Sequence, residues 1–79
     1  MRADICDPSD EGAVERFRRT LRSLGAQLGG KDWVVGTDIY RLRIGEQELV
    51  VFSDTWSVDI EGPEDLVQRV LREYGQTVA

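Results

Sequence analysis

Residue types that usually carry chemistry are scarce in this chain of 79 residues. It contains no histidine and a single cysteine, Cys6, so no disulfide can form within the chain. A zinc site would also lack both of its common ligand types. General acid–base catalysis near neutral pH most often uses histidine, and the carboxylates around Cys6 would raise the pKa of its thiol instead of activating it. We therefore expect a protein that is not an enzyme and that holds no metal or cofactor.

Long apolar runs are missing as well. No stretch approaches the ~18 apolar residues that cross a bilayer, and the charged start of the chain does not resemble a signal peptide. A lone cysteine fits a reducing compartment. These features predict a cytoplasmic protein that does not contact membranes.

Basic residues are the minority among the charges. Fifteen acidic residues against ten basic ones give a net charge of −5, which repels phosphate backbones and favours basic partners. A domain this short buries a modest fraction of its surface and is only marginally stable alone, so self-association would help it. We expect a protein partner, either a second copy of the chain or a basic protein, and we expect nucleic acid to be disfavoured.

A first helix is predicted over residues 8–24. Asp7 can cap it and Pro8 fits the first helical position. Its apolar positions recur at helical spacing and are Val14, Phe17, Leu21 and Leu24. Gly25 favours a stop after residue 24 over a continuation through Leu28.

A second helix is predicted over residues 63–74. Gly62 stands at its cap, Pro63 at its first position, and Glu64 and Asp65 in its first turn, where acidic side chains suit the helix dipole. Gly75 is the expected terminator. The apolar stripe consists of Leu66, Val67, Val70, Leu71 and Tyr74.

The segment between the helices predicts an antiparallel sheet with strands at 33–44, 48–53 and 56–61, preceded by a flexible joint at 29–32. Gly36 interrupts the first strand. Either one long strand bends there, or a short extra strand folds back beside 39–44, and the sequence does not decide between these.

The strand register follows from burial, because directly opposed residues share a face of the sheet. Pairing Ile44 with Leu49 and Val51 with Val58 avoids burying the Glu48 carboxylate. One face then collects the core residues Tyr40, Leu42, Ile44, Leu49, Val51, Trp56, Val58 and Ile60. The position of Trp33 is left open.

The predicted architecture is a single α+β domain over 1–79 with the order α-β-β-β-α. It is a three-stranded antiparallel meander with both helices packed on one face. The strand at 48–53 is apolar on both faces, although the open face of such a sheet is usually polar.

We call the apolar and charged side chains on that open face the outer patch. Its members are Ile39, Arg41, Arg43, Val50, Phe52 and Asp59. An apolar centre with a charged rim is typical of a partner-binding surface. The alternative is that the aliphatic stems of Arg41 and Arg43 shield Val50 and Phe52 without any partner. We take the outer patch as the expected site of protein–protein interaction.

A nucleic-acid-binding domain is the alternative function, using Arg41, Arg43 and the arginines of the first helix. The α-β-β-β-α order resembles that of double-stranded-RNA-binding domains. Those domains dock phosphates with basic residues at the start of their second helix, where this chain has Glu64 and Asp65. The charge at this position favours the protein-interaction hypothesis.

Overall fold

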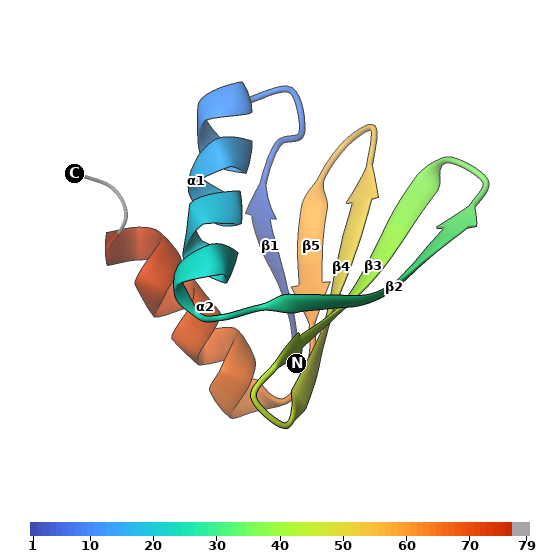
Figure 1. Cartoon of the computed structure of the whole chain (residues 1–79). Coiled ribbons are helices and arrows are strands. Elements are labelled where there is room, and N and C mark those ends of the chain that lie inside the picture. Colours follow the sequence, from blue (N-terminus) through green and yellow to red (C-terminus); the bar gives the residue numbers. More distant parts are fainter. Residues whose placement is uncertain (77–79) are drawn as a thin grey trace.

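The computed structural model describes residues 1–76 and contains two helices and one five-stranded antiparallel sheet (Figure 1). The elements are β1 (Arg2–Cys6), α1 (Glu11–Ser23), β2 (Gln27–Val34), β3 (Thr37–Ile44), β4 (Gln47–Asp54), β5 (Val58–Glu61) and α2 (Glu64–Gln76). Their order across the sheet is β1-β5-β4-β3-β2. The α+β class is confirmed, and the prediction of three strands is wrong.

The first unpredicted strand is β1, which forms one edge of the sheet by pairing with β5. Ala3 lies opposite Ile60, and both Ala3 and Ile5 are partly buried against the core. Apolar and charged residues alternate from Arg2 to Ile5, which is the period of a strand with one buried face. The segment is short and contains charged residues, so the sequence analysis did not predict a strand there.

The second unpredicted strand is β2, which forms the other edge. It covers the predicted joint at 29–32 and pairs with β3, so the predicted strand 33–44 is two strands joined by a tight turn. The turn brings Val34 opposite Thr37, and Gly36 adopts a φ of +81°, which favours glycine. The extra strand therefore folds back beside β3, with a bulge between Leu28 and Gly30.

The predicted strand register is wrong by two residues at both later turns. Leu49 lies opposite Leu42 and not Ile44, and Val51 lies opposite Ile60 and not Val58. The turn between β3 and β4 is the two-residue pair Gly45-Glu46, with φ of +64° at Gly45. A shift of two residues leaves every side chain on its original face, because strand side chains alternate with period two.

Trp56 is the error in the predicted core. It lies in the loop between β4 and β5 and is 83% exposed. The Asp54 carboxylate accepts hydrogen bonds from the backbone N–H groups of Trp56 and Ser57, at 2.7 and 2.8 Å. These bonds stabilise a wider loop than the predicted two-residue turn, so Trp56 never enters a strand.

Helix α1 begins three residues later than predicted because Asp10, and not Asp7, caps it. The Asp10 carboxylate accepts from the N–H of Ala13 at 3.0 Å, whereas Asp7 accepts from the N–H of Ser9 at 2.9 Å in the preceding turn. Gly25 follows the helix with φ of +76°.

The end of α1 has the hydrogen bonds of a Schellman motif. Ala26 N–H donates to Leu21 C=O at 3.0 Å, and Gly25 N–H donates to Arg22 C=O at 3.1 Å. Helix α2 runs to Gln76, two residues beyond its predicted end, so Gly75 lies inside the helix.

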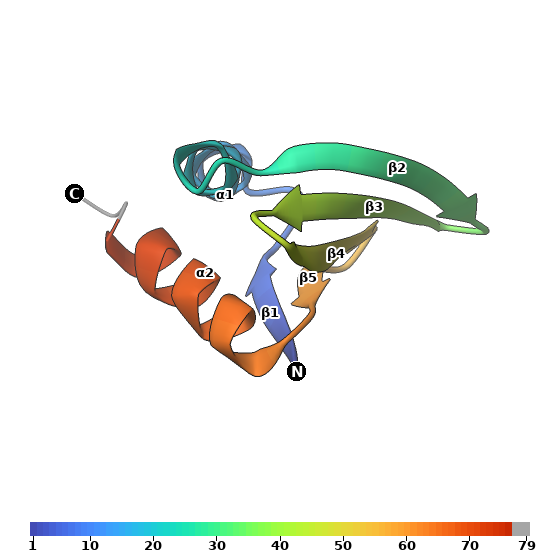
Figure 2. The same cartoon turned by 60° about the horizontal axis from the view of Figure 1, so that its bottom comes forward.

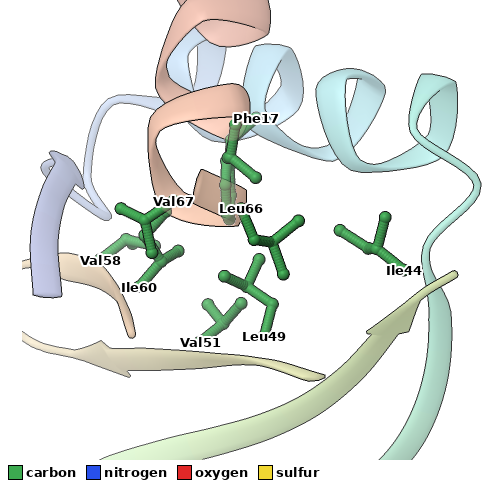
Figure 3. Close-up of a cluster of buried hydrophobic side chains, with 9 residues drawn as sticks. Phe17, Ile44, Leu49, Val51, Val58, Ile60, Leu66 and Val67 are labelled. Carbon is green, nitrogen blue, oxygen red and sulfur yellow. The ribbon is translucent and has the colours of Figure 1, made fainter. Parts of the chain in front are cut away.

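The core lies between the helices and the inner face of the sheet (Figure 3). Side chains from both helices and from three strands meet there, namely Phe17, Ile44, Leu49, Val51, Val58, Ile60, Leu66, Val67 and Val70. Helix α1 contacts α2 and β1, and α2 contacts β1 and β4. Figure 2 shows that the β2–β3 hairpin extends away from both helices.

Candidate interaction surfaces

The predicted members of the outer patch do lie together on the open face of β3, β4 and β5. Ile39, Phe52 and Asp59 form one row across these strands, and Arg41 and Val50 form the next. Arg43 lies at the end of the patch, opposite Glu48 and not opposite Val50 as the predicted register implied. The apolar members Ile39, Val50 and Phe52 are each half-buried.

Arg2 shields part of the outer patch. Its guanidinium carbon lies 4.4 Å from the centre of the Phe52 ring, and its Nη2 atom lies 3.1 Å from Asp59 Oδ2. Arg41 forms an ion pair with Asp32 on β2. An arginine does cover Phe52, but it comes from β1, the strand that was not predicted.

A pair of carboxyl groups lies beside this arginine. Asp4 on β1 is directly opposite Asp59 on β5. The pKa of Asp4 is raised, first because its carboxyl group hydrogen-bonds that of Asp59 and then because the charge of Asp59 repels its own. For Asp59, burial acts to raise the pKa, but hydrogen bonds with Arg2, Asp4 and Ser57 outweigh it and lower the pKa. As pH falls, Asp4 is therefore protonated before Asp59.

The other face of the sheet is only half covered by helices. The helices contact β1 and β4, and Ile44 at one end of β3 is buried in the core. The rest of the β2–β3 hairpin extends away from both helices (Figure 2), which leaves inner-facing side chains there partly or largely exposed. We call these side chains the hairpin surface, and its members are Leu28, Lys31, Trp33, Asp38 and Tyr40. Leu28 is 64% exposed and Trp33 is 67% exposed.

The charges of the hairpin surface have opposite signs. Lys31 Nζ lies 5.2 Å from the centre of the Tyr40 ring, which is a cation–π arrangement. Asp38 lies directly opposite Trp33. Among residues 1–76, neither Lys31 nor Asp38 forms an ion pair.

A groove of about 240 Å³ runs between α1 and the hairpin surface. Its walls are mostly apolar and include Val14, Phe17 and Leu21 from α1 and Tyr40, Leu42 and Val51 from the sheet. Val14, Phe17 and Leu21 follow helical spacing, so α1 turns one continuous stripe toward both the core and the groove. The groove extends the hairpin surface to the helix layer.

Further apolar side chains gather at one end of the sheet. The β2–β3 turn and the β4–β5 loop are neighbours there, because Thr37 pairs with Asp54. Val35 and Trp56 are 90% and 83% exposed at these turns. The sequence prediction missed this region because it left Trp33 unplaced and assigned Trp56 to the core.

Cys6 is the free cysteine of the described residues. Burial, followed by the charge of Asp10, raises the pKa of the Cys6 thiol, which disfavours the reactive thiolate. Within residues 1–76, no three side chains of His, Cys, Asp or Glu are grouped so that they could hold a metal ion. Neither described helix combines the length and the apolar character needed to cross a membrane.

Comparison with known proteins gives no matching family model, no matching curated protein and no matching solved structure.

Proposed function

We propose that this protein is a small non-catalytic interaction domain that binds a protein partner through the hairpin surface. The observation that carries the proposal is the exposure of Trp33 and Leu28, which lie on the same sheet face as the buried core residues. Large exposed apolar side chains that adjoin an apolar groove are typical of partner-binding surfaces. A partner bound over Trp33 and Leu28 would cover the part of the inner sheet face that the helices leave exposed.

The edge of β2 favours binding through side chains over the addition of a further strand. The strand carries a bulge between Leu28 and Gly30, and Lys31 points to the inner face. Both features discourage pairing of another strand with an exposed sheet edge. The partner therefore contacts the face of the hairpin and not its edge.

The outer patch supports the interaction hypothesis less strongly. Its apolar members are half-buried, and Arg2 already lies over Phe52. We keep it as the competing surface for the same function. A second copy of the chain and a basic protein are the two partner classes that its size and its net charge of −5 favour.

An affinity capture experiment with mass spectrometry tests the proposal. We would immobilise the wild-type protein, the Trp33→Glu variant and the Arg19→Glu variant, which carries its change on an exposed side of α1. A partner retained by the wild type and by Arg19→Glu, and lost by Trp33→Glu, is the expected result. Identical retention by all three folded proteins would contradict binding through the hairpin surface.

A further inference from the structure

The hairpin surface carries a charge pattern that complements itself, and we infer that its partner is a second copy of this chain. This inference rests on the proposed function and names the partner at the same surface. Lys31 and Asp38 lie on adjacent strands and both face inward. A twofold axis that places Lys31 of one copy against Asp38 of the other creates the same contact a second time, as in any isologous interface.

Within the monomer, the Lys31 ammonium group contacts the Tyr40 ring. Among the described residues 1–76, Lys31 and Asp38 lack ion-pair partners, while Arg2, Arg18 and Arg41 have them. A uniformly acidic or basic partner would pair one of the two charges and bury the other next to a like charge. A second copy pairs both, so charge complementarity favours self-association over a partner of one sign.

The exposed apolar area is small for an interface between two copies of the chain. Trp33 and Trp56 are 67% and 83% exposed at the same end of the sheet. An aromatic side chain offers about 150–250 Å² when fully covered, so Trp33, the tryptophan of the hairpin surface, provides roughly 100–170 Å². A standard interface buries ~800 Å² per partner. The other members of the hairpin surface supply part of the area that is still needed. We expect a weak dimer with a dissociation constant of ~1–100 µM.

Exchanging the two charges tests this arrangement. Sedimentation velocity over ~1–500 µM protein would measure the dissociation constants of the wild type, Lys31→Asp, Asp38→Lys and the double variant. Each single variant brings like charges together twice in the dimer, and we expect each to weaken dimerisation at least ~10-fold. The double variant reverses both charges and keeps their complementarity, so we expect its dissociation constant to return to within ~3-fold of wild type.

Mixing the two single variants provides an internal check. A heterodimer of Lys31→Asp with Asp38→Lys contains two opposite-charge contacts, so the mixture should dimerise more tightly than either variant alone. Arg19→Glu changes the net charge by the same amount as Lys31→Asp and lies outside the hairpin surface, and it should dimerise like the wild type. Circular dichroism of each variant confirms that it is folded.

Three results would overturn the inference. They are a wild-type protein that stays monomeric at ~500 µM, single variants that dimerise like the wild type, and a folded double variant that fails to recover. If the wild type is monomeric but Trp33→Glu still loses a captured partner, the proposed function stands and the second-copy inference fails. If no variant changes any interaction, both fail.

Discussion

The inner face of the sheet has two halves in which apolar side chains alternate along the strands in the same way. The two halves differ in how far those side chains are buried. On β4 and β5, Leu49 and Ile60 are fully buried, whereas on β2 Leu28 and Trp33 are about two-thirds exposed. The difference lies in the connections. Helix α1 follows β1 and α2 follows β5, and these two strands are neighbours, so both helices start above the same edge of the sheet. Strand pattern sets the face of a side chain, and chain topology sets whether anything covers it.

The largest contrast should come from placing lysine on each half of this face. Val51→Lys puts a charge into the core, at a cost of more than about 4 kcal/mol, which is comparable to the whole stability of a small domain. We expect circular dichroism to show an unfolded chain. A folded Val51→Lys protein with an unchanged melting temperature would mean that the helices do not exclude water from the inner face of β4 and β5.

Trp33→Lys is the matched change on the uncovered half. The side chain is 67% exposed, so we expect the melting temperature to stay close to that of the wild type, with a free-energy change within about 0.5 kcal/mol. Thermal unfolding followed by circular dichroism measures this directly. Unfolding comparable to that of Val51→Lys would show that the hairpin surface is part of the core.

Phe52→Lys compares the outer patch with the hairpin surface. The change removes the Arg2 contact and places two cations together, which should cost about 1 kcal/mol and lower the melting temperature by roughly 4–8 °C. We expect the association state and the partner affinity to stay at the wild-type level. A folded variant that loses association, while Trp33→Lys keeps it, would move the binding surface to the outer patch.

The smallest effect should come from Asp4→Asn, and its sign depends on pH. The raised pKa of Asp4 makes a stabilising contribution that is present below the ordinary value of 3.8 and is lost as pH rises through the raised value. The lowered pKa of Asp59 acts in the opposite sense, with stabilisation present above its ordinary value and lost as pH falls.

Asparagine can still donate to Asp59 but cannot ionise, so the variant should gain stability at neutral pH and little near about pH 4. Melting temperatures of both proteins at the two pH values measure the difference. If the melting temperatures of the two proteins differ by the same amount at both pH values, repulsion between the two carboxylates does not cause the difference.

Much of the fold was predictable because burial depends on parity. The inner positions Leu42, Ile44, Leu49, Val51 and Ile60 were assigned to the correct face despite a register error of two residues. The register itself depended on turn chemistry, since glycine at position 45 favours a tighter turn than the predicted one. Local pattern alone did not specify it.

The missing strands have two different causes. β1 has only five residues, and its partner β5 is distant in the sequence. β2 contains Gly29 and Gly30, which read as a joint because glycine is usually rare inside strands. The hairpin surface could not be predicted without β2. The outer patch could, because it depends only on the alternation along β3, β4 and β5.

The pairing of β1 with β5 also bears on how the chain reaches its folded state. The ion pair between Arg2 and Asp59 spans 57 positions in the sequence, whereas the hairpins from β2 to β5 each close over a few residues. Local hairpins can form soon after their own residues are synthesised, but β1 cannot pair until β5 has been made. β1 thus finds its neighbour later than the strands of the local hairpins do, and the edge of β5 stays unpaired until β1 docks.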